Sequence, residues 1–238
     1  MTKIHRHGPI ESLAENLWIV TGSSQFPLPR NMVIHRLPTG SLFLHSVVAM
    51  HEEGMRALEA IGPPGVIVVP SASHRLDAPF YKERYPNAVL LCPEASRARV
   101  AEKVPVDGTC EERLEDLGVR VYRARGLKPV ELVYGLDIGK TPQTALVFND
   151  ALFHLEHQPG LAGMVLRGIG STGFFGMSRL ARFSLLESAS ELADWLREMS
   201  HDDGLRCVTV SHGAPLVEDV GARLRDAAER IDGRREGA

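Results

Sequence analysis

Residues 66–74 read Val66-Ile67-Val68-Val69-Pro70-Ser71-Ala72-Ser73-His74, an apolar run that a proline closes and that leads into a histidine. A short apolar run bounded by turn residues is typical of a buried strand. Helical patterns flank this strand at 51–61 and 78–85, and a further apolar run at 88–92 precedes a helical pattern at 94–102. This alternation predicts parallel strands with helices on their faces.

The segment before this alternation is rich in strand signals instead. Three β-like runs lie at 17–20, 31–36 and 41–45, and Leu37-Pro38-Thr39-Gly40 is a natural hairpin turn between the last two. Closely spaced strands without intervening helices predict an antiparallel start to the sheet.

The second half of the chain repeats this order of strands followed by strand–helix units. The expected elements are strands at 119–122, 130–134, 144–148 and 206–210, a glycine-rich loop at 158–176, a helix capped by Ser190, and a last helix at 217–231. Two similar halves are consistent with a two-sheet sandwich that carries helices outside. We therefore expect one α/β (α+β) domain over 1–238, with 1–8 and 234–238 frayed.

The composition of the chain argues against two classes of function, nucleic-acid binding and membrane spanning. The 238 residues are 44% hydrophobic, enough for one sizeable core, and a net charge of -3 lacks the basic excess of nucleic-acid-binding proteins. No window reaches the roughly 18 consecutive apolar residues of a membrane helix, and residues 1–8 lack the apolar stretch of a signal peptide. We expect a cytoplasmic protein with no membrane or nucleic-acid partner, whose three cysteines are buried reduced thiols.

Four apolar runs end in a histidine or an aspartate, namely His45, His74, Asp150 and His212. Ligands bind α/β folds at the carboxyl ends of strands, so these side chains could share one cleft. Imidazole and carboxylate are the ligands that zinc, manganese and iron accept. Taken alone, each histidine is more often a solvated turn residue or a packing residue, but the recurrence of the pattern favours a site.

Several segments resemble a bacterial family of unknown function that is related to the metallo-β-lactamase superfamily. They are Glu15–Val20, Met32–Pro38, Leu42–Ser46, Val68–His74, Tyr85–Ala88 and Val210–Pro215, and together they span nearly the whole chain. The resemblance implies a four-layer αββα sandwich with a dinuclear metal site on one edge.

The family's metal motif is degenerate in this chain. The superfamily signature HxHxDH should fall at 73–78, where only His74 and Asp77 remain, and no histidine stands near 126–128. Asp150 matches the bridging carboxylate of the superfamily, and His212, followed by Gly213, matches its final histidine. The resemblance therefore implies one metal ion held by three ligands, because two ions would need more ligands than remain.

Other residues are candidates for the same cleft. The expected neighbours are Asp77 as a base, His45 beside the ligands, and His154 and His157 as substitutes for missing ligands. Arg75 replaces a ligand in the motif: pointing inward it would favour an anion or a metal-free site, and pointing outward, which is commoner for arginine, it is a surface charge. The loop 168–176, with Phe174 and Phe175, is either a mobile lid or a connection whose phenylalanines fill the core.

Two functions follow from this pattern. The first is a non-catalytic protein that has lost its metal and binds an anionic small molecule, which the low ligand count favours. The second is a mononuclear hydrolase of an ester, amide or phosphoester that uses one divalent metal, zinc in the first place. An interaction protein that binds through Phe174 and Phe175 is a weaker third hypothesis.

Overall fold

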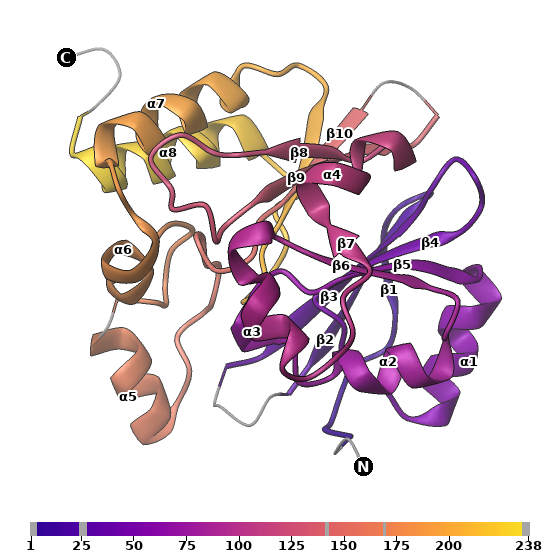
Figure 1. Ribbon diagram of the computed structural model, residues 1–238. Coiled ribbons are helices and arrows are strands. Elements are labelled where there is room, and N and C mark those ends of the chain that lie inside the picture. The colour runs from indigo at the N-terminus through magenta and orange to yellow at the C-terminus, as the bar shows by residue number, and fades with distance from the viewer. Residues whose placement is uncertain (1–3, 24–27, 141–142, 169, 235–238) are drawn as a thin grey trace.

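The computed structural model describes residues 4–23, 28–140, 143–168 and 170–234. These residues form two β-sheets with helices outside them (Figure 1). The first sheet has seven strands in chain order: β1 (Glu11–Ala14), β2 (Leu17–Gly22), β3 (Arg30–Arg36), β4 (Leu42–His45), β5 (Pro64–Val68), β6 (Val89–Cys92) and β7 (Gly108–Thr109). Strands β1 to β4 pair antiparallel and β4 to β7 pair parallel, as the sequence predicts.

The second sheet has four strands in the described residues, in the order β11-β10-β9-β8. They are β8 (Arg120–Tyr122), β9 (Val133–Ile138), β10 (Gln143–Val147) and β11 (Leu205–Thr209). Strands β8, β9 and β10 are antiparallel, whereas β10 and β11 are parallel. Strands β10 and β11 therefore end at the same edge, which is where Asp150 and His212 follow them.

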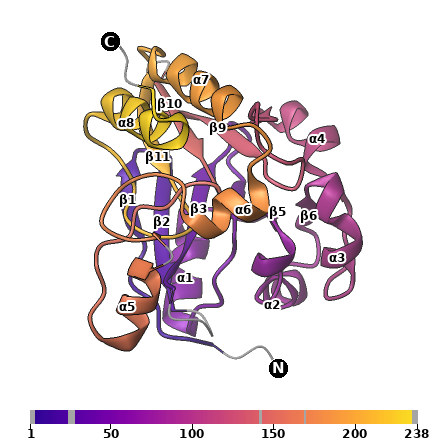
Figure 2. The same ribbon diagram turned by 90° about the vertical axis from the view of Figure 1, so that its left-hand side faces the viewer.

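Helices lie around the two sheets in the described residues. They are α1 (Glu52–Ile61), α2 (Ala78–Arg84), α3 (Arg97–Ala101), α4 (Cys110–Arg113), α5 (Gly160–Gly168), α6 (Arg179–Leu185), α7 (Ala189–Ser200) and α8 (Val220–Asp232). Helices α7 and α8 lie together over one outer side, and α1 and α2 lie on the opposite side (Figures 1 and 2).

Three apolar cores show the four-layer order directly. In β4, Phe43 packs between the sheets while Leu42 and Leu44 pack outward against α1 and α2, because successive side chains of a strand point to opposite faces. The outer face of the second sheet packs on α7 and α8 through residues such as Trp195 and Leu224. The fold class is thus the αββα sandwich that the resemblance implies.

Some expected elements differ in the structure. Residues 160–168 form α5 within the expected loop, and α6 was not expected at all. Ser188, not Ser190, caps α7 by accepting a hydrogen bond from the Glu191 N–H, and the last helix begins at Val220 rather than at residue 217. The three cysteines are buried and free, as expected.

The N-terminal stretch was expected to be frayed, but residues 6–8 are paired. Ser23 N–H donates to Arg6 O, Gly8 N–H donates to Thr21 O, and His51 N–H donates to His7 Nε2. Residues 1–3 and 235–238 lie outside the described residues. Within the described part of the chain, no helix combines the length and apolar character needed to cross a bilayer.

Candidate metal centre

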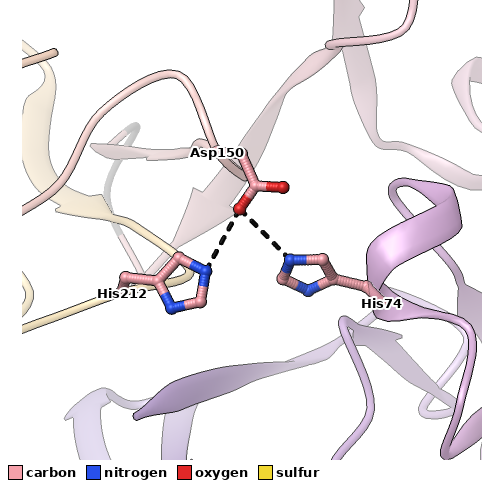
Figure 3. A group of neighbouring side chains, drawn as sticks. All are labelled: His74, Asp150 and His212. Atoms are coloured by element: carbon pink, nitrogen blue, oxygen red, sulfur yellow. Dashed lines mark hydrogen bonds and ion pairs between the residues drawn. The ribbon is translucent and has the colours of Figure 1, made fainter. Parts of the chain in front are cut away.

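Three predicted ligands converge at the edge where the strands of both sheets end. His74 belongs to a 3₁₀ turn (Ala72–His74) that follows β5, Asp150 follows β10, and His212 follows β11. One ligand atom from each lies within 4.8 Å of the others. Asp150 Oδ1 is 3.2 Å from Nε2 of His74 and 3.2 Å from Nε2 of His212 (Figure 3). The structure therefore brings together the three side chains that the sequence named as candidate ligands.

The outer nitrogen of each histidine has its own partner. His212 Nδ1 lies 2.7 Å from the Pro29 carbonyl oxygen, which can only accept, so Nδ1 carries the proton. His74 Nδ1 lies 2.7 Å from Ser46 Oγ, which can accept in the same way. With the proton on Nδ1, a neutral ring presents the Nε2 lone pair toward Asp150. This is the tautomer and the outer hydrogen bond that metal-binding histidines show.

The charges of the three residues also suit a cation. Burial works to raise the pKa of Asp150, but positive charge at the adjacent His74 and His212 outweighs it and holds that pKa well below the usual range, so a cation at this place keeps the carboxylate ionised. Burial lowers the pKa of His74, although Asp150 partly opposes it, which favours the neutral ring. An ionised carboxylate and a neutral imidazole are the forms that bind zinc.

A buried glutamate that the sequence analysis did not single out fixes the Asp150 turn. Glu131 Oε1 accepts hydrogen bonds from the backbone N–H groups of Asn149 and Ala151, both at 3.1 Å. Burial, followed by the charge of Asp150, raises the pKa of Glu131 to about 8. The sequence signal was a lone acid in the apolar run 130–134. Such a residue requires a buried polar partner.

Asn31, on β3, holds the turn that carries His212. Its side-chain amide donates to the carbonyl oxygens of Val210 at 2.8 Å and Gly213 at 2.6 Å, and its backbone N–H donates to Ser211 O. The first sheet is thereby fastened to the end of β11. The position of His212 thus depends on strands from both sheets.

Asp77 does not join the three ligands. Its carboxylate forms an ion pair with Arg30, and Oδ2 also accepts from the backbone N–H of Ala49 at 3.2 Å. Arg30 is buried and donates to the Val47 carbonyl as well. These contacts make Asp77 the counter-charge of Arg30, a role that the sequence did not indicate for either residue.

His45 lies beside the site and is fully buried. Burial, with a smaller contribution from His74, lowers its pKa to about 3, so the ring is neutral. Its ring packs edge-on against Tyr134 at 5.3 Å between centroids, and Nε2 has no hydrogen-bond partner among the described residues. His45 therefore lies near His74 and Asp150 and packs against Tyr134.

The remaining candidates point elsewhere. Arg75 pairs with Glu102 at 3.1 Å and donates to the Arg99 carbonyl, so it is bound at α3; its side chain is 13% exposed and is not the surface charge expected. His154 Nδ1 lies 2.8 Å from Ala214 O, and His157 Nδ1 lies 2.9 Å from Thr172 Oγ1. In the part of the chain that the structure describes, neither histidine joins the three-residue cluster. They fasten loops rather than replace missing ligands.

The two phenylalanines of the glycine-rich segment are packed. Phe175 is buried in the core under α7 and α8 and touches the His154 ring edge-on at 5.8 Å. Phe174 is half-buried beneath the Arg230 guanidinium, 5.4 Å from the ring centroid. Of the two alternatives for this segment, the structure shows the packed connection.

Comparison with known proteins identifies the fold of the chain. No family model matches the chain, and no curated protein matches its sequence. Solved structures do match: the DIM-1 metallo-β-lactamase exposed to ceftazidime has a TM-score of 0.62 and 16% identity, over 97% of this chain and 99% of that one. A metallo-β-lactamase from Erythrobacter litoralis has a TM-score of 0.58 and 16% identity, over 96% of this chain and 100% of that one. The mono-zinc form of FIM-1 from Pseudomonas aeruginosa has a TM-score of 0.53 and 10% identity, over 94% and 96%. This chain therefore has the metallo-β-lactamase fold.

Proposed function

We propose that this protein is a hydrolase that binds one divalent metal ion, zinc, through His74, Asp150 and His212. The observation that carries the proposal is the convergence of these three ligand atoms within 4.8 Å of one another. Three protein ligands that leave a position open for water are the usual arrangement of catalytic zinc. When bound, such an ion supplies the Lewis acidity that activates water toward an ester, amide or phosphoester.

The surrounding residues support this assignment by what they hold in place. Ser46 and the Pro29 carbonyl orient the two imidazoles, and Glu131 fixes the turn of Asp150. Outer hydrogen bonds of this kind raise metal affinity by restricting ligands to the binding geometry. Each of the three proposed ligands is thus positioned by another residue. A chance cluster of side chains on a surface would not be expected to have such contacts.

A single metal ion fits the charges better than two. Asp77, which the degenerate motif leaves as a candidate for a second site, faces the Arg30 guanidinium instead. A fixed positive charge repels a divalent cation, and this carboxylate is already paired. Arg30 thus supplies the positive charge next to Asp77 that a second ion would otherwise provide.

The alternative, a metal-free protein that binds an anionic small molecule, has less support than the sequence suggested. That hypothesis rested on Arg75 and on the small number of ligands. Arg75 is engaged by Glu102, and the charge of Arg30 is compensated by Asp77. Both guanidinium groups already pair with a carboxylate, so we rank the metal-dependent hydrolase first.

Metal analysis tests the proposal. Chelator-treated protein titrated with Zn²⁺ should bind one ion per chain, and His212→Ala should weaken binding at least about 100-fold because one of three ligands is lost. His201→Ala, at the exposed end of α7, is the matched control and should bind like the parent. A panel of nitrophenyl esters, phosphodiesters and anilides should then show zinc-dependent hydrolysis. Parent protein that holds no zinc, or holds it equally well without His212, would contradict the proposal.

A further inference from the structure

Exposed apolar side chains are concentrated on two neighbouring helices. Among the described residues, five large apolar side chains on α5 and α6 are between 61% and 87% exposed: Leu161, Met164, Val165, Leu180 and Phe183. The three on α5 are spaced i, i+3 and i+4, and the two on α6 are spaced i and i+3, so each set lies on one helix face. Leu166 and Ala181 face inward and are buried. Both helices thus have an apolar inner face and an apolar outer face.

The same segment carries only positive charge. Residues 157–186 contain Arg167, Arg179 and Arg182 and no aspartate or glutamate, in a chain whose net charge is -3. All three arginines are exposed, and none forms an ion pair with a described carboxylate. Arg179 donates to Gly168 O at 3.3 Å, which links the start of α6 to the end of α5. Exposed apolar groups and unpaired cations therefore share one pair of helices, which follow one another on the side that Figure 2 turns toward the viewer.

We propose that α5 and α6 dock on the surface of an anionic lipid bilayer. An apolar helix face that carries arginines is the combination that inserts shallowly among lipids and pairs with negatively charged headgroups. The expectation of no membrane partner rested on the lack of a long apolar run in the sequence, which does not bear on binding at the bilayer surface. The proposal is independent of the proposed hydrolase activity.

A second copy of the chain fits this surface less well. A two-fold contact places the same patch against itself, so the arginines of both copies, Arg167, Arg179 and Arg182, would share one interface. Residues 157–186 offer no carboxylate to neutralise them. Like charges held together in an interface oppose association. Negatively charged headgroups, in contrast, complement both the charge and the apolar character of the helices.

Vesicle sedimentation tests the proposal. The full chain should sediment with vesicles of phosphatidylcholine and phosphatidylglycerol, should bind phosphatidylcholine vesicles far less, and should be released by high salt. The variant Arg167→Gln/Arg179→Gln/Arg182→Gln should bind the mixed vesicles at least about ten-fold more weakly. The control Arg56→Gln/Arg99→Gln/Arg123→Gln has the same net charge but changes exposed arginines elsewhere, and it should bind like the parent.

A second pair of variants tests the apolar contribution. Leu161→Ser/Phe183→Ser should also lose binding, whereas Val217→Ser, at an exposed apolar residue outside the two helices, should not. His212→Ala should bind vesicles like the parent, which separates this proposal from the metal site. Equal binding to neutral vesicles, no binding to mixed vesicles, or equal loss in the two arginine variants would overturn it. Self-association that Phe183→Ser abolishes, without vesicle binding, would assign the surface to a second copy.

Discussion

Arg30 and Asp77 show how one contact changes the role of a residue. By sequence, Asp77 is the remnant of a metal motif and a candidate base. In the structure its carboxylate holds the buried guanidinium of Arg30, whose charge also lowers the pKa of His74. Oδ2 of this carboxylate already accepts from Arg30 and from the Ala49 N–H. At the residue scale, the contact with Arg30 predicts a structural role for Asp77.

Asp77→Ala should therefore destabilise the protein, by about 3 kcal/mol, because it leaves Arg30 buried without its counter-charge. Urea unfolding measures this. The double variant Arg30→Met/Asp77→Ala should recover part of the loss, since the cost belongs to the unpaired charge. Asp77→Ala with unchanged stability but abolished hydrolysis would instead restore the interpretation of Asp77 as a base.

The strands that lead to the candidate site could be predicted, because each is a short apolar run with a clear strand pattern. The strands before His45, His74, Asp150 and His212 are apolar runs, and their polar ends gave the candidate site. Helix α5 was missed because Gly160, Gly163 and Gly168 are residues that favour loops, and packing of Leu166 outweighs that preference. Local sequence does not report such packing, so the helix could be found only from the fold.

The turns that carry the candidate ligands are held in place by residues that are distant in the sequence. Gly213 has φ +113, and a Cβ there would lie 1.9 Å from the carbonyl oxygen of His154. An apolar run followed by a polar residue indicated His212. The same pattern did not indicate that His154 and Asn31 lie against the next residue, Gly213. The residues that position the ligands, including Ser46 and Glu131, come from other strands, so their roles were not visible in the sequence.

Glu131 predicts a pH dependence for the Asp150 turn. Its folded pKa of about 8 exceeds the ordinary value of 4.5, so the folded protein keeps a proton that the unfolded chain releases. The stability that this contributes is complete below the unfolded pKa and is lost as pH rises toward the folded pKa. Parent stability should fall between about pH 5 and pH 8, by at most roughly 3 kcal/mol from this group.

Glu131→Gln removes this titration while keeping an oxygen for the two N–H groups. The difference in unfolding free energy between parent and variant should therefore shift in favour of the variant as pH rises. Urea melts of chelator-treated protein across this range measure the difference. Glu83→Gln, at an exposed position on α2, should leave the slope unchanged. A parallel pair of curves for parent and Glu131→Gln would show that Glu131 is ionised when folded.

At the scale of the whole molecule, the site belongs to both halves of the sandwich. His74 comes from the first sheet, whereas Asp150 and His212 follow strands of the second. Asn31 and Arg30, on β3, reach the same edge. The opposite edge is closed by Asn16, whose amide donates to Asp137 O and whose oxygen accepts from Gly139 N–H. A ligand held by the three site residues would thus connect the two sheets.

Zinc should consequently stabilise the whole fold, since the unfolded chain does not bring residues 74, 150 and 212 together. At a free zinc concentration 100 times the dissociation constant, the gain should be about 2.7 kcal/mol. Thermal melts at rising zinc should show a midpoint that increases with concentration in the parent. Asp150→Asn removes the ionised ligand and should flatten this response, while His201→Ala should keep it. A zinc-dependent rise of the same size in Asp150→Asn would place the bound ion elsewhere in the chain.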